Sequence, residues 1–98
     1  MPKPEIIILE SNRANAPSFS PALERKGYSV RIHHKLDKAL TEAKRSTPEV
    51  LILDAASMRT SGTRMSRKAR AALDGTPIIL VSPEGNLTTA YFPSRAAN

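Results

Sequence analysis

The pattern of apolar and polar positions along the chain predicts four strands. Three short, unbroken runs of mainly branched apolar residues lie at 5–9, 50–54 and 78–81. Continuous runs of this length are typical of strands that are buried on both faces, as in parallel sheets. Segment 28–33 alternates apolar and polar residues instead, which indicates a strand with one wetter face, at the edge of the sheet.

Helical spacing appears between the predicted strands. Apolar residues recur on one face of segment 36–46, and the same holds for segment 64–74, so both segments predict amphipathic helices. A further helix is expected before residue 27, although Pro17 and Pro21 interrupt its pattern. Because proline is tolerated in the first turn and costs about 3 kcal/mol in a helix interior, this helix should begin near one of the two prolines. Gly27 should end it.

Strands and helices therefore alternate along the chain, which predicts an α/β fold. A parallel sheet with helices on both faces satisfies this order, and right-handed crossovers make it a doubly wound sheet. With 98 residues the chain is a single domain. We assign residues 1–85 to the α/β domain and residues 86–98 to a C-terminal stub. Within that stub, 88–92 could form a short fifth strand and 93–98 resemble a loose end.

Composition excludes several classes of protein. The chain has no cysteine, so disulfides and thiolate metal sites are ruled out. No apolar run approaches the roughly 20 residues that a membrane-spanning helix needs, so we expect no membrane partner. No secretion signal is visible at the N-terminus. Together these features favour a cytoplasmic protein.

Motifs of the common enzyme classes are absent from the sequence. No glycine-rich nucleotide-binding loop follows a predicted strand, and no serine stands in a nucleophile elbow. His33 and His34 are adjacent on a strand and point to opposite faces, so they cannot chelate one ion together. We therefore predict that the chain is not an enzyme and assign it no catalytic residue.

Polar residues stand directly at the ends of three predicted strands. These residues are Glu10, Asp54 and Ser82. In a doubly wound sheet the carboxyl ends of neighbouring strands meet at one crevice, where ligands bind. Asp54, at the end of the central run, is the foremost candidate for function. The alternative is that Asp54 only begins a turn of the Asx type.

Segments spread over residues 5–84 resemble the receiver domain of bacterial response regulators. The segments that carry this resemblance are 6–12, 23–30, 39–40, 48–54, Met58 with Gly62, and 77–82. The resemblance implies a flavodoxin-like, three-layer α/β/α fold. It also implies that Asp54 occupies the phospho-acceptor position and Ser82 the position of the switch hydroxyl. Glu10 occupies the position of the first of two acids that hold magnesium.

The chain departs from the receiver pattern at positions that matter for chemistry. Ser11 stands where the second metal-binding acid is expected, and no lysine follows Lys68 to supply the cation that pairs with the phosphate. A magnesium site built from Glu10 and Asp54 lacks much of its ligand charge. Because phosphoryl transfer depends on cations that neutralise negative charge, we expect a degenerate receiver with weak or no phosphorylation.

The chain is also short at its C-terminus relative to receivers. There is no room for the fourth helix and the fifth helix that the resemblance implies, so one flank of the sheet should lack its cover. Uncovered apolar surface often marks an interface. We therefore expect a homodimer, which could exchange the C-terminal segment between copies.

Basic residues gather in the predicted helix at 64–74. The chain carries a net charge of +6, and its densest basic block contains no acid; it includes Arg59, Arg64, Arg67, Lys68 and Arg70. The simplest interpretation is the solvated face of an amphipathic helix. The alternative is contact with nucleic-acid phosphates, without stacking because aromatic residues are scarce.

The leading hypothesis from sequence is an atypical receiver-like signalling module of a two-component-type regulator. It would act on a protein partner or an output domain by contact. One alternative is a small nucleic-acid-binding protein that uses the basic helix. The other is a genuine receiver that accepts a phosphoryl group at Asp54.

Overall fold

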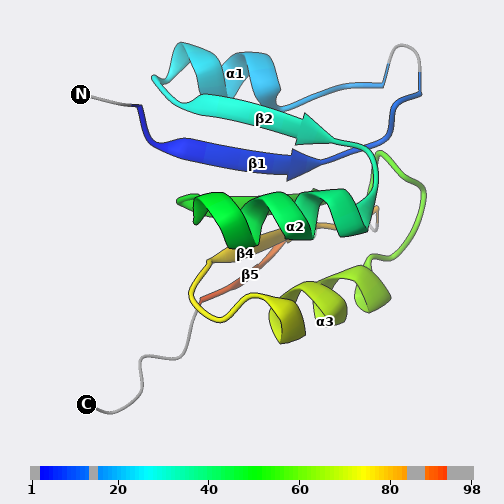
Figure 1. Ribbon diagram of the computed structural model, residues 1–98. Helices are drawn as coiled ribbons and strands as arrows, with labels where there is room; N and C mark the ends of the chain where they lie inside the picture. Colours follow the sequence, from blue (N-terminus) through cyan, green and yellow to red (C-terminus); the bar gives the residue numbers. More distant parts are fainter. Residues whose placement is uncertain (1–2, 14–15, 84–87, 93–98) are drawn as a thin grey trace.

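The sheet has five strands in the order β2-β1-β3-β4-β5 (Figure 1). The computed structural model describes residues 3–13, 16–83 and 88–92. In chain order its elements are β1 (Glu5–Leu9), α1 (Ser20–Arg25), β2 (Ser29–His33), α2 (Leu36–Ser46), β3 (Val50–Asp54), α3 (Thr63–Ala72), β4 (Ile78–Val81) and β5 (Thr88–Tyr91).

Four of the five strands are parallel, which confirms the predicted fold class. β1 lies between β2 and β3, and β4 pairs with the other side of β3. β5 runs antiparallel to β4, with Ile78 opposite Tyr91 and Val81 opposite Thr88. Antiparallel neighbours need no crossover helix between them, unlike parallel ones. The fifth strand therefore extends the sheet without the helix that a parallel strand would require.

Helices cover the two faces of the sheet unequally. α2 and α3 lie side by side on one face, where their alanines and leucines pack on alternate residues of the central strands, including Ile7, Leu51 and Leu53 (Figure 1). The opposite face carries the smaller cluster of Ile6, Ile8 and Ile52. Leu23 of the six-residue α1 packs there. The arrangement is the predicted three-layer α/β/α fold, with one layer thin.

Local sequence explains where the helices begin and end. α1 carries Pro21 in its first turn, where a missing backbone N–H costs nothing, and Gly27 follows its end with φ of +100°. α3 begins after Gly62, whose φ is +80° and whose carbonyl accepts the Ser66 N–H at 2.9 Å. α3 ends at Ala72, two residues before the predicted end, because Leu73 is already extended.

The C-terminal predictions have mixed outcomes. Segment 88–92 does form a strand, at Thr88–Tyr91. The loose end predicted at 93–98 lies outside the described residues, and the division of the chain at residue 85 stays a prediction. Within the described ranges, every helix is too short or too polar to cross a bilayer.

Candidate functional site

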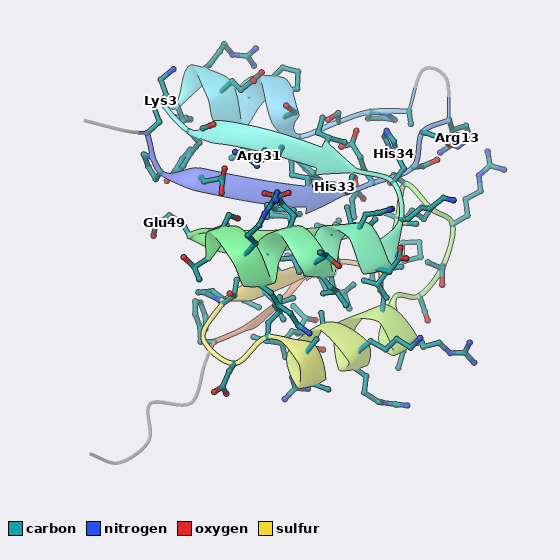
Figure 2. The ribbon with its side chains drawn as sticks, viewed as in Figure 1. Lys3, Arg13, Arg31, His33, His34 and Glu49 are labelled. Carbon is teal, nitrogen blue, oxygen red and sulfur yellow. The ribbon has the colours of Figure 1, made fainter. Side chains whose placement is uncertain are left out.

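The carboxyl ends of β1, β3 and β4 meet at one edge of the sheet. Leu9 pairs with Leu53, and Asp54 pairs with Val81, so Glu10 and Ser82 follow the strands on either side of Asp54. Figure 2 shows Arg13 and His34 at this same edge, towards which the arrowheads of β1 and β2 point. The register thus brings together the strand ends that the sequence singled out.

Asp54 is buried within a turn that its own side chain organises. Asp54 as a whole is only 4% exposed. The Ser57 backbone N–H donates to Asp54 Oδ1 at 3.1 Å, and the Ser57 hydroxyl donates to the Asp54 carbonyl at 2.8 Å. The Asp54 side chain therefore caps a turn through the residue three positions on, whereas an Asx turn bonds the residue two positions on. Burial raises the pKa of Asp54 above its ordinary value, and the hydrogen bonds from Ser57 offset only part of that rise.

Ser57 connects the loop after β3 to the loop after β1. Its hydroxyl accepts the Ser11 backbone N–H at 2.9 Å, and its carbonyl accepts Arg13 Nη2 at 3.1 Å. The Ser11 hydroxyl accepts the Arg13 backbone N–H at 3.0 Å. Sequence reasoning did not identify Ser57 or Arg13, since neither stands at a strand end. The only signal was the position of Ser57 three residues after Asp54, as in a turn that an Asp side chain caps.

Glu10 is held by the segment that precedes α1 and by the residue that follows β2. It is 8% exposed, and its Oε1 accepts the Ser18 hydroxyl at 2.8 Å. Ser18 Oγ also accepts the Ser20 N–H at the start of α1, at 3.1 Å. His34 Nδ1 lies 3.0 Å from the Glu10 carbonyl. The contact explains the position of His34 at this edge without a metal ion.

A cavity of about 280 Å³ adjoins Asp54. Asp54, Ser57 and Arg13 supply its polar lining, and Phe19 and Val81 supply apolar walls. Arg13 is thus a cationic group that borders the same cavity as the Asp54 carboxyl. A guanidinium group can pair with an oxyanion through a planar fork of N–H donors, but it does not replace the compact charge of a divalent ion.

Glu10 and Asp54 are the two carboxylates at this edge that the sequence predicted as magnesium ligands. Among the described residues, no three His, Asp or Glu side chains are grouped so that they could hold one metal ion. Ser11 has a hydroxyl at the position where receivers have a further metal-binding carboxylate. That hydroxyl already accepts the Arg13 backbone N–H. Magnesium is usually held by one or two carboxylates together with phosphate oxygens and water. The magnesium site therefore stays a prediction.

The basic block forms the exposed face of α3, as the sequence predicted. Its helical members are Arg64, Arg67, Lys68 and Arg70, and all four are exposed. None of them lines the cavity beside Asp54. The Arg70 guanidinium lies over the Tyr91 ring, 4.3 Å from its centroid. The basic block and the strand-end site are therefore two separate features.

Comparison with known proteins supports the receiver-like interpretation at a coarse level. The chain is 28% identical over 83 residues to response regulator MprA of Mycobacterium avium (strain 104) and of Mycobacterium tuberculosis (strain ATCC 25618 / H37Rv). It is 26% identical to response regulator MprA of Mycobacterium ulcerans (strain Agy99). The chain is receiver-like. No protein-family model matches it.

The similarity of this receiver-like domain extends over only part of those relatives. The aligned residues make up 85% of this chain and 36% of each relative. The chain therefore spans about a third of the length of the curated relatives it matches. The activity and partners of a whole regulator do not follow from the match, and neither does the state of Asp54.

Proposed function

We propose that the chain is an atypical receiver-like module of a two-component-type regulator that acts by protein contacts, with weak or no phosphorylation. It is a signalling module in this proposal, not an enzyme. The observation that carries the proposal is the position of Asp54. Asp54 is the last residue of β3 in a receiver-like sheet, yet it is buried, and its carboxylate accepts the backbone N–H of Ser57. The similarity to response regulators supports the signalling role.

Electrostatics at the strand ends argue against efficient phosphoryl transfer. The attacking group must be an ionised carboxylate, and the raised pKa of Asp54 lowers the ionised fraction. The transferred group needs cations that neutralise its charge. Glu10 is engaged by Ser18, Ser11 adds no carboxylate, and the chain has no lysine after Lys68. Regulation by contact with a partner needs none of these groups.

Acetyl phosphate with magnesium tests the proposal directly. The protein is incubated with both, and intact mass measures the fraction that carries one phosphoryl group. We expect no more adduct on the wild type than on Asp54→Asn. Asp74→Asn is the matched control, because Asp74 is an exposed acid that does not line the cavity beside Asp54. A stoichiometric adduct that is lost in Asp54→Asn and kept in Asp74→Asn would instead establish a phospho-accepting receiver.

One observation favours that second candidate, a genuine phospho-accepting receiver. Arg13 borders the cavity beside Asp54 and donates to Ser57, so a cation is near the acceptor position. If this candidate holds, Arg13→Gln should lower the yield of the adduct, while Arg25→Gln on the exposed surface of α1 should leave it unchanged. The same mass measurement decides between the two candidates.

The homodimer also stays a proposal, and the thin α1 layer supports it. On the α1 side of the sheet, Ile79 and Val81 are only partly buried, and Ala90 opposite Ile79 is exposed. Light scattering at high micromolar concentration should give the mass of two chains, and Ala90→Glu should shift the mass towards one. A monomeric mass for the wild type would refute the dimer.

A further inference from the structure

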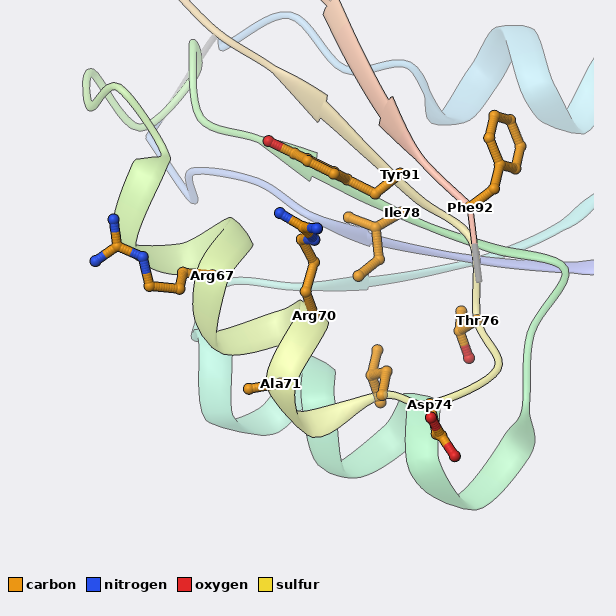
Figure 3. Close-up of a pocket in the computed structure, with 9 residues that line it drawn as sticks. Arg67, Arg70, Ala71, Asp74, Thr76, Ile78, Tyr91 and Phe92 are labelled. Carbon is orange, nitrogen blue, oxygen red and sulfur yellow. The ribbon is translucent and has the colours of Figure 1, made fainter. Parts of the chain in front are cut away.

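A second cavity lies between α3 and β5, with a lining entirely different from that of the cavity beside Asp54. Its volume is about 400 Å³, and Figure 3 shows it between the last turns of α3 and the end of β5. Arg67 and Arg70 border it from the helix, and Tyr91 and Phe92 border it from the strand side. This α3–β5 hollow combines positive charge with apolar surface, and none of its lining residues belongs to the cavity beside Asp54.

Arg70 is held in place before any ligand arrives. Its guanidinium group lies over the Tyr91 ring at 4.3 Å, and Figure 3 shows the side chain reaching from α3 towards β5. A guanidinium stacked on a ring keeps its N–H donors in its own plane, so they stay available for a carboxylate. Because the side chain is already ordered, an ion pair formed there loses less conformational entropy.

The positive charge beside the hollow is not neutralised within the described part of the chain. There the ion pairs join Arg31 to Glu5 and Glu42, and Arg45 to Glu42. The cations of α3 take part in none of them. An acidic partner would therefore gain attraction without first displacing an internal acid.

Apolar atoms form the floor and one wall of the same hollow. Leu73 and Ile78 are buried beneath it, 7% and 2% exposed. Phe92 stands at its edge and is 76% exposed. At protein interfaces, pockets that take one large apolar side chain contribute much of the affinity, while charges at the rim add specificity.

We propose that the α3–β5 hollow binds an acidic segment of a partner protein, which inserts one large apolar side chain and pairs its carboxylates with Arg67 and Arg70. A second copy of this chain fits poorly, because a two-fold contact would bring the same arginines together. A nucleic-acid backbone also fits less well, since the apolar floor of Leu73 and Ile78 offers phosphate no hydrogen-bond donor. The inference rests on the proposed function, because it names the surface for the protein contacts.

Fluorescence anisotropy with short labelled peptides tests the inference. The probes are acidic peptides with a central leucine or phenylalanine, the same peptides with serine at the centre, and a duplex DNA of unrelated sequence. Arg67→Gln/Arg70→Gln is the test variant. Arg64→Gln/Lys68→Gln is the matched control, because it removes the same charge from the same helix outside the hollow. Phe92→Ser tests the apolar wall without any change of charge.

We expect the acidic peptide with an apolar centre to bind and the serine-centred version to bind more weakly. Arg67→Gln/Arg70→Gln should weaken binding by about tenfold or more, whereas Arg64→Gln/Lys68→Gln should change it by about twofold at most. Phe92→Ser should also weaken it. Circular dichroism checks that each variant folds. Arg67→Lys/Arg70→Lys keeps the positive charge and removes only the guanidinium groups.

Three results would overturn the inference. They are equal losses in the two double variants, tighter binding of the DNA than of every peptide, and no binding of any peptide at millimolar concentration. Asp54→Asn should bind the peptide as the wild type does. If no peptide binds, the hollow is not a docking site for an acidic segment. The proposed function is then still decided separately, by the mass measurement of phosphorylation.

Discussion

Gly62→Ala should destabilise the protein more than any other glycine substitution in the described part of the chain. Gly62 precedes α3 with φ of +80°, and a Cβ there would lie 2.5 Å from Leu80 Cδ1 and 2.7 Å from the Ala55 Cβ. The left-handed conformation costs a non-glycine residue about 1–2 kcal/mol. Ala55 is fixed to the backbone of a buried loop and cannot rotate away, so overpacking should add about 1–3 kcal/mol.

Gly27→Ala is the matched control for this prediction. Gly27 also has positive φ, +100°, but an added Cβ would meet nothing within 4 Å. It should therefore lose only the conformational part, about 1–2 kcal/mol. The total for Gly62→Ala, about 2–5 kcal/mol, is a large fraction of the roughly 5–15 kcal/mol expected for a domain of this size.

Urea denaturation followed by circular dichroism measures both variants. With an m-value of about 1–3 kcal/mol/M, the additional loss in Gly62→Ala should lower its midpoint by on the order of 1 M below that of Gly27→Ala. Equal midpoints for the two variants would refute the reasoning, because they would mean that close contact with Leu80 and Ala55 contributes nothing.

Three further predictions concern the strand-end site and the surface. Because burial raises the pKa of Asp54 in the folded state, the contribution of Asp54 to stability is fully present below the unfolded value of 3.8 and is lost as pH rises through the folded pKa. Asp54→Asn should remove this loss and stabilise the protein at neutral pH, as urea midpoints across pH will show; an unchanged pH profile would contradict it. Ser57→Ala should cost about 1–3 kcal/mol, since the Ser11 N–H loses its acceptor, while Ser61→Ala at an exposed position should cost less than about 0.5 kcal/mol. Thermal melts that rank the two serines in reverse would count against this role. Arg31→Ala should cost only about 0–1 kcal/mol despite its two ion pairs, because its side chain is 52% exposed; a larger loss that persists in high salt would show a packing role.

The strands were predictable because each carries its own pattern. The unbroken apolar runs at 5–9 and 50–54 require burial on both faces, and only a central position in a parallel sheet supplies it. The alternation at 28–33 correctly placed that segment at an edge. Once the strands were known, their shared carboxyl edge followed, and with it the neighbouring positions of Glu10 and Asp54.

Two features were not predicted, for different physical reasons. The reversed direction of β5 depends on the length of the link from Val81 to Thr88, which is too short for the dozen or so residues of a parallel crossover. The length of this link is visible in the sequence and by itself favours an antiparallel fifth strand. The roles of Ser18 and Ser57 were not accessible in the same way. A serine hydroxyl bonds to whatever the folded loops bring near it, and no periodicity marks such a residue.

The double use of the Ser57 hydroxyl has a consequence for how a change at Asp54 would spread. One oxygen both donates to the Asp54 carbonyl and accepts the Ser11 N–H. If the Ser57 side chain rotated about its Cα–Cβ bond towards a newly charged or modified Asp54 side chain, its hydroxyl oxygen would move and both bonds would be released together. The loop after β1 would then lose an anchor at the moment the loop after β3 changed shape. A perturbation of one buried carboxyl would thus alter two distant segments of the sequence together.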